Sequence, residues 1–159
     1  MTAVRVALLV WKPQNPDTPG DVSRGWPRVL QTRDSDTPWQ APSVILRPGE
    51  LVVPAAERVA YVLGLVLPQH HRVLCVDQWP PAPEAPRGLT LVLDGGWLAG
   101  DDVRGDGDDI GPCSCGSQHQ RRWVRADRTG SVALMTAVSA AVLKSPAFVV
   151  SPGTAAPQS

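Results

Sequence analysis

The chain has 159 residues and a formal net charge of zero, with 15 Lys and Arg against 15 Asp and Glu. This length suits one domain with a normal core, expected over residues 1–150, followed by a flexible tail over 151–159. Zero net charge argues against general electrostatic binding to nucleic acid or to anionic lipid. No apolar run reaches the roughly 18 residues that a membrane span needs. The acids are skewed, because twelve are Asp and only Glu50, Glu57 and Glu84 are Glu.

The cysteines and the first residues favour a cytoplasmic protein. The chain has three Cys, an odd number, which argues against a disulfide framework. The apolar start MTAVRVALLVW is not followed by a small-residue cleavage site, so it predicts a first strand rather than a secretory signal. The preference for Arg, Ala, Pro, Val and Asp suggests a bacterium with a GC-rich genome.

Hydrophobic patterning predicts strands and helices in a mixed order. Pro54 fits the first position of a helix and Gly64 fits its end. The strands expected in chain order are Arg5–Trp11, Trp26–Arg33, Ser43–Leu46, Arg72–Asp77, Leu89–Asp94, Gln120–Arg125 and a short Phe148–Val150. The helices expected are Pro54–Leu63 and Ser131–Leu143. This order predicts an α/β (α+β) domain with a largely central sheet.

The middle of the chain contains a spaced set of residues that points to a family. The segment Trp39–Leu65, WQAPSVILRPGELVVPAAERVAYVLGL, has a Pro-Gly-Glu turn, and seven residues separate Glu50 from Arg58. In this register the segment resembles the motif of the Nudix hydrolases, and the following RVLCVDQWPPAPEAPRGLTLVLDGGWL is similar to the strand, loop and strand that come next in some bacterial members. The resemblance implies a Nudix-like mixed β-sheet sandwiched between helices.

The departures from the family pattern fall on its chemistry. Val44 stands where the motif has glycine, and Val59, Val62 and Leu63 stand where its helix has three glutamates. In active members those carboxylates bind the Mg²⁺ or Mn²⁺ that activates water and neutralises a diphosphate. A hard cation needs several oxygen ligands, and Val and Leu offer none. We therefore expect no cofactor, with Mg²⁺ bound only if the chain is a divergent active hydrolase.

Three functions remain open. The leading one is binding of a small molecule in the former substrate cleft, as a repurposed metal-independent enzyme of isomerase, cyclase or lyase type in bacterial specialised metabolism. A second is a divergent hydrolase of a nucleoside-diphosphate-linked substrate that uses Glu50 with the acidic loop Asp101–Asp109. A third is a non-catalytic binding or regulatory subunit.

The replaced positions also create a stripe. Val59, Val62, Leu63 and Val66 recur near the helical period, so they would form one apolar face. That face could be extra core, a homodimer interface, or the wall of an apolar pocket in the old metal cleft.

The candidate site residues come from strand ends, turns and aromatic rims. Asp77 and Asp94 each end a strand beside a loop, where they could act as general acid or base or merely cap a turn. His71, in the turn His70-His71, and Glu50 are further catalytic candidates. Trp39 and Trp97 would stack on a ligand or plug the ends of the sheet.

Arg58 and Val62 complete the expected ligand-binding set. They belong to the helix that carries the family motif.

One further segment has metal-ligand chemistry. Cys113, Cys115 and His119 in GPCSCGSQH could begin a zinc site, although the spacing is not a standard one and no second pair completes it. A reactive thiol pair or an ordinary loop are the alternatives. For Asp101–Asp109, five Asp in nine residues, a solvated acidic loop is the default interpretation.

Overall fold

The computed structural model describes residues 2–34, 37–81, 83, 87–99, 111–112 and 120–150, with the side chains of residues 111, 112 and 148 left aside. The acidic loop, the Cys113–His119 segment and the C-terminal tail therefore lie outside the described residues. The strands are β1 (Ala3–Lys12), β2 (Arg28–Arg33), β3 (Ser43–Ile45), β4 (Val73–Trp79), β5 (Gly88–Trp97), β6 (Gly111–Pro112), β7 (Gln120–Arg125) and β8 (Phe148–Val150). The helices are α1 (Val52–Leu63), α2 (Val132–Leu143) and the short 3₁₀ turn η1 (Ala126–Arg128).

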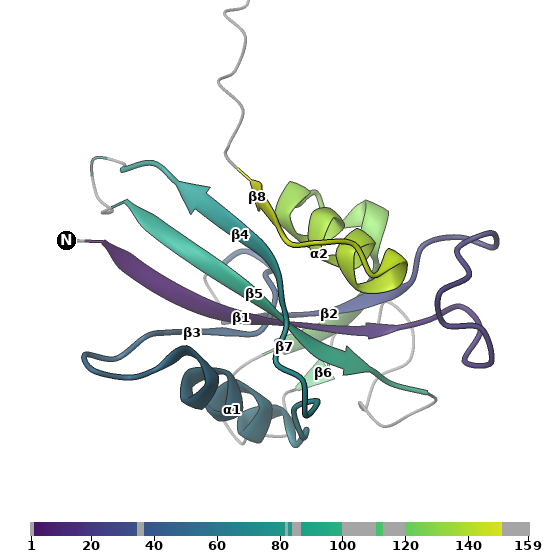
Figure 1. Cartoon of the computed structure of the whole chain (residues 1–159), viewed down its shortest axis with the longest axis horizontal. Coiled ribbons are helices and arrows are strands. Elements are labelled where there is room, and N and C mark those ends of the chain that lie inside the picture. The colour runs from purple at the N-terminus through teal and green to yellow at the C-terminus, as the bar shows by residue number, and fades with distance from the viewer. Residues whose placement is uncertain are drawn as a thin grey trace, which may run out of the picture.

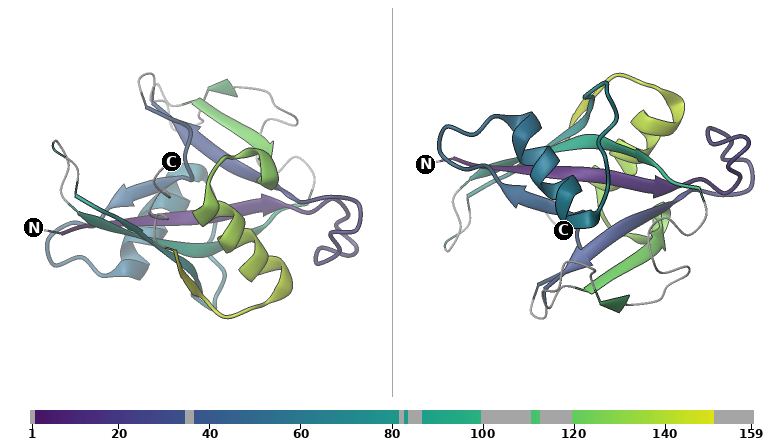
Figure 2. Two further views of the ribbon diagram at one scale, coloured as in Figure 1. Left: turned by 90° about the horizontal axis from the view of Figure 1, so that it is seen from above. Right: turned by 90° about the horizontal axis from the view of Figure 1, so that it is seen from below.

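One mixed sheet contains all of these strands. Its order is β6-β7-β2-β1-β5-β4-β8, and β3 pairs with β1 off this path. β1 runs parallel to β5 on one edge. Its other edge is shared, because β3 pairs antiparallel with residues 5–7 and β2 with residues 11–12. Figure 2 shows β2 and β7 leaving the line of β1 at an angle, which opens the sheet on this side.

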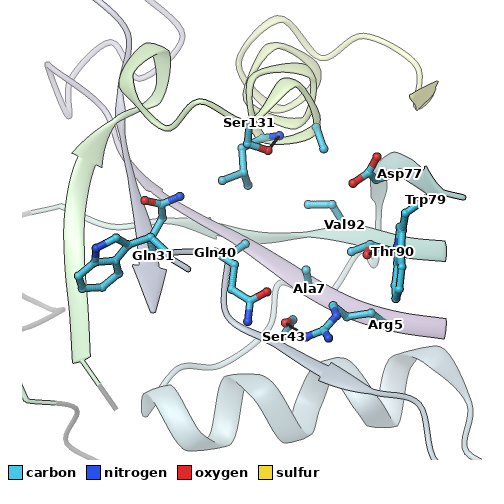
Figure 3. A pocket seen from close by; sticks show the side chains of 14 residues that line it. Arg5, Ala7, Gln31, Gln40, Ser43, Asp77, Trp79, Thr90, Val92 and Ser131 are labelled. Atoms are coloured by element: carbon cyan, nitrogen blue, oxygen red, sulfur yellow. Dashed lines mark hydrogen bonds between the residues drawn. The ribbon is translucent and has the colours of Figure 1, made fainter. Parts of the chain in front are cut away.

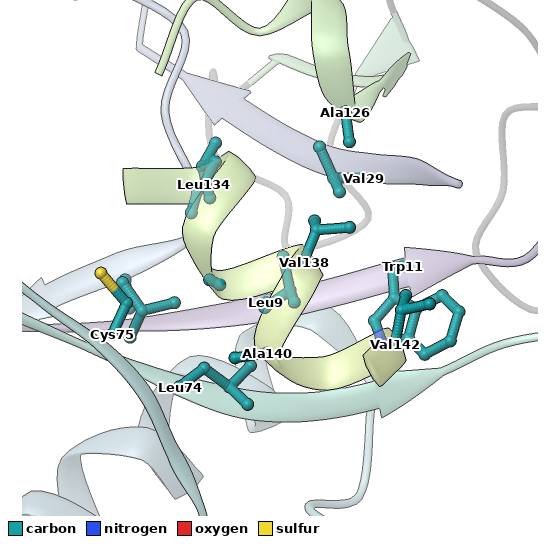
Figure 4. Packing of buried hydrophobic residues seen from close by; sticks show 14 of the residues in the cluster. Leu9, Trp11, Val29, Leu74, Cys75, Ala126, Leu134, Val138, Ala140 and Val142 are labelled. Carbon is teal, nitrogen blue, oxygen red and sulfur yellow. The ribbon is translucent and has the colours of Figure 1, made fainter. Parts of the chain in front are cut away.

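The two helices cover opposite faces of the sheet, as Figure 1 shows, which confirms the expected sandwich. Alternate side chains of β1 point to opposite faces of the sheet, as the two-residue period of a strand requires. Ala7, Leu9 and Trp11 belong to the core under α2, shown in Figure 4. Val6 and Leu8 belong to the core under α1. The apolar run in β1 is thus buried on both faces, as predicted.

Helix α1 begins two residues earlier than its sequence indicates. Leu51 is the N-cap and Val52 the first helical residue, so Pro54 is third rather than first. The position is still tolerated, because the N–H groups of the first turn have no partner inside the helix. Gly64 ends the helix in the left-handed region, with φ of 72°, and the N–H of Leu65 donates to Ala60 O at 2.9 Å. This is the predicted glycine stop.

Helix α2 is apolar on all sides and is held at both ends by polar contacts. The hydroxyl of Ser131 accepts from Leu134 N at 3.1 Å and caps the N-terminus. At the other end, Arg72 Nη2 donates to Ala140 O at 3.0 Å and also to Ser145 O. Within the described ranges, neither helix is long and apolar enough to cross a membrane.

Strand β5 extends beyond its predicted end. It continues three residues past Asp94, through Gly95 and Gly96 to Trp97. A side chain at Gly95 would place its Cβ 2.9 Å from Leu9 O, so the glycine permits close approach to β1. β4 likewise continues past Asp77 to Trp79. The end of β4 pairs with β5, and Trp97 of β5 pairs with Trp11 of β1, so partner strands stabilise residues that look like loop in the sequence.

Introducing a glutamate at position 59 should destabilise the fold. Val59 is 4% exposed and packs in the core under α1, so Val59→Glu would bury a carboxylate among apolar side chains. We expect a loss of about 3–5 kcal/mol in the free energy of unfolding, measured by urea denaturation. Val62→Glu is the control, because Val62 is 45% exposed and should change stability little. Equal losses in both variants would contradict the packing described.

Candidate functional site

A cavity of about 320 Å³ lies between the sheet and the N-terminal end of α2. It is therefore on the opposite face of the sheet from α1 (Figures 1 and 3). Its walls combine aliphatic, aromatic and polar side chains from many segments. They are Arg5, Ala7, Gln31, Trp39, Gln40, Ala41, Ser43, Asp77, Trp79, Thr90, Val92, Ser131, Ala133 and Leu134. Such a mixture of apolar walls and a few converging polar groups is typical of small-molecule sites.

Asp77 is the catalytic candidate that the structure places in this cavity. It projects from β4 and is half-buried. Burial raises the pKa of its carboxyl above the ordinary value of 3.8, because a low-dielectric surrounding disfavours the charged form. Burial and the charge of Asp77 together raise the pKa of the neighbouring Cys75 thiol to about 11. Cys75 is therefore an unreactive core residue.

Trp79 forms the outer wall of the cavity. Its Nε1 donates to Thr90 Oγ1 at 3.2 Å across the strand pair. Its ring lies on Gly88, where an added Cβ would come within 2.5 Å of the ring carbons. The glycine is thus needed for the ring to lie flat against β5.

Trp39 is the other predicted residue in the cavity, and two arginines hold its ring. The guanidinium of Arg33 lies 4.4 Å from the ring centroid and that of Arg122 lies 4.6 Å from it. Arg122 also donates through Nε and Nη2 to Gln31 Oε1, at 3.0 and 2.7 Å. Gln31 is fully buried, so this contact satisfies a polar group that would otherwise be costly in the core.

Asp94 and Trp97 lie at a different place from Asp77 and Trp39. They line a second hollow of about 440 Å³, near the C-terminal end of α2, together with Arg72 and Lys144. Asp94 Oδ1 accepts from Gly96 N at 2.9 Å, which is the turn-capping role weighed from the sequence. The ring of Trp97 lies 6.4 Å from that of Trp11.

Glu50 and Arg58 form an ion pair that shapes the turn before α1. Arg58 donates through Nε and Nη2 to the two carboxylate oxygens of Glu50, at 3.2 and 2.9 Å. Arg47 N donates to Glu50 Oε2 at 2.9 Å. The Arg58 guanidinium, followed by this backbone N–H, holds the pKa of Glu50 below its usual value. Both residues therefore support local structure, outside the cavity.

The remaining candidates lie on the surface. His71 is exposed and borders a shallow groove with Glu57 and Tyr61. Val62 is also exposed, on the side of α1 that faces away from the sheet. The structure therefore brings together Asp77 and Trp39, and it separates them from the other predicted site residues.

The other polar side chains that line the cavity were not predicted from the sequence. Arg5, Thr90 and Gln31 each sit inside a largely apolar strand. Arg5 was a signal for a polar site, because a charged residue within a run of buried apolar residues is uncommon. Which of them face a common space depends on strand register, which the sequence does not show.

The arrangement of strands and helices is similar to that of several solved Nudix structures. The MutT protein from Methanosarcina mazei Go1 is 14% identical, with a TM-score of 0.54 over 90% of this chain and 94% of that protein. The Ap4A hydrolase of C. elegans is 16% identical, with a TM-score of 0.54 over 91% and 100%. The Nudix domain of NrtR from Shewanella oneidensis, solved with ADP-ribose, is 13% identical, with a TM-score of 0.50 over 93% and 80%.

This chain has a Nudix-like fold. No protein-family model matches it, and no curated protein is similar to it in sequence. At identities of 13–16% the likeness shows the fold alone.

Three side chains of α1, at the positions that the Nudix resemblance assigns to metal-binding carboxylates, do not fit the divalent cation that the fold family implies. Val59 packs in the core, Leu63 packs against it, and Val62 projects outward, so none supplies an oxygen ligand. Elsewhere in the described part of the chain, no three His, Cys, Asp or Glu side chains lie together in a way that could hold a metal ion.

The raised pKa of Asp77 should make stability depend on pH in a defined direction. The protonated acid is favoured in the folded state, so its stabilising contribution is present below pH 3.8 and is lost as the pH rises through the raised folded pKa. Asp77→Asn should therefore melt at a higher temperature than the parent protein at neutral pH, and the difference should narrow in acid.

Melting temperatures of both proteins from neutral pH to below pH 3.8 would check this. Asp77→Ser, which also removes the carboxyl, should show the same pH dependence. A difference that stays constant across the range would contradict the burial of this carboxyl.

Proposed function

We propose that this protein binds a small organic molecule in the cavity beneath α2 and has lost metal-dependent diphosphate hydrolysis. The observation that supports it most is the contrast between the two faces of the sheet. The α1 face has apolar residues at positions that the Nudix resemblance assigns to metal ligands, whereas the α2 face has a cavity lined by converging polar groups. Any catalysis would then take place on the α2 side without a resident metal.

The state of Glu50 also argues against an active hydrolase. Its carboxylate oxygens accept hydrogen bonds from Arg58 and from Arg47 N. A single carboxylate already bound in this way is a poor ligand for a cation that needs several oxygens. The other acids considered for that role, Asp101–Asp109, lie outside the described residues.

If the protein converts its ligand into a product, we propose Asp77 as the general acid or base. A general acid or base works best when its pKa is moved toward the working pH, and burial moves the pKa of Asp77 in that direction. Its place beside Trp79 and Thr90 would hold a bound molecule against the carboxyl. Isomerase, cyclase or lyase chemistry, each possible with one proton donor and acceptor, is compatible with such a site.

A thermal-shift panel with and without MgCl₂ tests this function. The panel should contain ADP-ribose, dinucleoside polyphosphates, amino compounds and organic acids. A true ligand should stabilise the fold equally with and without Mg²⁺, by about 2.7 kcal/mol at a concentration of 100 times its Kd. Trp39→Ala should abolish the shift, and Trp97→Ala, a matched change outside the cavity, should preserve it.

Three outcomes would contradict the proposal. One is a ligand whose shift survives Trp39→Ala. Another is hydrolysis of ADP-ribose or a dinucleoside polyphosphate that requires Mg²⁺ and disappears in Glu50→Gln. The third is a panel, extended to short peptides, in which no compound shifts the melting temperature.

A specific observation favours an interaction role as a second candidate. Tyr61, Val62 and Val66 are 85%, 45% and 92% exposed at the C-terminal end of α1. Large apolar side chains exposed near one another often mark contacts between proteins. We propose that this patch could pair two copies of the chain.

Introducing a charge into the patch should prevent such pairing. Tyr61→Glu should leave the melting temperature unchanged, since the side chain is exposed, but should convert a dimer to a monomer in sedimentation velocity runs. A parent protein that is monomeric at high concentration would refute the homodimer.

A further inference from the structure

Three residues of the cavity form a row across the sheet. Arg5 of β1 pairs with Thr90 of β5, and Thr90 pairs with Asp77 of β4. Paired residues of neighbouring strands project to the same face, and all three line the cavity. Figure 3 shows them on the same side of the space, with Trp79 next to Asp77. The cavity floor therefore presents a guanidinium, a hydroxyl and a carboxyl in that order.

The two charged groups of the row do not neutralise each other. Arg5 Nη1 donates to Ser43 Oγ at 3.0 Å. Ser43 belongs to β3, which pairs with the edge of β1 opposite to β5, so the contact draws the guanidinium away from Asp77. Among the described residues, the carboxyl of Asp77 makes no hydrogen bond or ion pair. Opposite charges held apart in one cavity leave a place for a molecule that bridges them.

The strand spacing gives the approximate length of that molecule. β1 and β4 are separated by β5, so the backbones bearing Arg5 and Asp77 lie two strand spacings apart, about 10 Å. Trp79 projects from the same face of β4 two residues beyond Asp77, and its ring could face a cation bound at the carboxyl. At the other end, one guanidinium balances one negative charge. That favours a carboxylate over a phosphate, which carries about −1.5 to −2 at neutral pH.

We propose that the ligand is an extended zwitterion, with an ammonium group at Asp77 beside Trp79 and a carboxylate at Arg5, about 10 Å apart. This inference rests on the proposed ligand-binding function of the cavity. It narrows the substrate class to amino compounds that also carry a carboxylate, such as short peptides or extended amino acids.

Blocked and unblocked tri-alanine peptides test the charge requirement. An extended chain spans about 3.3–3.6 Å per residue, so the termini of tri-alanine lie near the required distance. The four probes are tri-alanine, its N-acetyl form, its C-terminal amide and the doubly blocked peptide. Calorimetric titration should show tri-alanine binding about tenfold more tightly than either singly blocked form.

Variants of the cavity assign each end of the peptide. Asp77→Asn should remove the preference for a free amino terminus while keeping the preference for a free carboxylate. Arg5→Gln should do the reverse. Asp17→Asn, an exposed acid outside the cavity, should change neither preference. Loss of preference, rather than loss of affinity, separates charge recognition from damage to the fold.

The possible results separate failure of the zwitterion proposal from failure of the proposed ligand-binding function. If the blocked peptides bind as well as tri-alanine, or if no peptide binds while the thermal-shift panel yields a ligand sensitive to Trp39→Ala, the zwitterion is refuted and the cavity remains a ligand site. If neither the peptides nor the panel yields binding, both the zwitterion and the ligand-binding function are refuted.

Discussion

The double burial of β1 is the constraint on which the rest of the fold depends. Residues Val6–Trp11 are at most 4% exposed, so both faces of this strand must be covered. One helix cannot do that, and the chain places α1 on one face and α2 on the other. Both edges of β1 are also paired, with β5 along one side and with β3 and β2 at different parts of the other. Covering one strand on four sides thus fixes most of the architecture.

The divided edge of β1 also creates the cavity. β3 pairs near its start and β2 near its end, so the chain between them crosses the α2 face, where Trp39, Gln40 and Ala41 become walls. Leu8 N donates to Pro42 O at 2.9 Å, which holds this crossing segment close to β1. A sheet whose edge was filled by one long strand would have no such opening. The site is therefore a consequence of how β1 is paired.

Polar contacts keep the cavity open on its inner side. Gln31 lies in the core, yet its amide oxygen accepts two hydrogen bonds from Arg122. Arg122 in turn contacts the ring of Trp39, so one buried amide, one guanidinium and one indole support each other. Breaking the contact with Arg122 would leave the buried amide oxygen of Gln31 unpaired, so this arrangement is costly to disrupt and keeps the wall rigid. Rigid walls reduce the ordering that a ligand must impose when it binds.

The residues of the Nudix-like segment have two different structural roles around α1. Glu50 and Arg58, two positions of the segment that resembles the Nudix motif, form an ion pair in the structure, a contact that was not predicted from the sequence. Where the motif has carboxylates, Val59 contributes to the core instead. A charged side chain could not occupy that position without a large desolvation cost. The packing beneath α1 and a metal site at Val59 are thus mutually exclusive uses of one position.

Local patterns in the sequence were enough to predict most elements and the fold class. Alternation and apolar runs predicted β1, β2 and β7, and Ser131 and Gly64 marked helix ends where the caps are found. These features depend on residues only a few positions apart, so the sequence alone reveals them. The ends of β4 and β5 could not be predicted in this way, because the residues past Asp77 are strand through pairing with β5, and those past Asp94 through pairing with β1.

The composition of the site was decided by tertiary structure. Asp77 and Asp94 look alike in the sequence, each at a strand end beside a loop, yet one faces the cavity and the other caps a turn at Gly96. Trp39 and Trp97 separate in the same way. Strand register sets which residues of β1, β5 and β4 stand side by side, and register arises from long-range pairing. The sequence alone thus determined the strands, the caps and the apolar character of α1, while the pairing around β1 decided which side chains share a cavity.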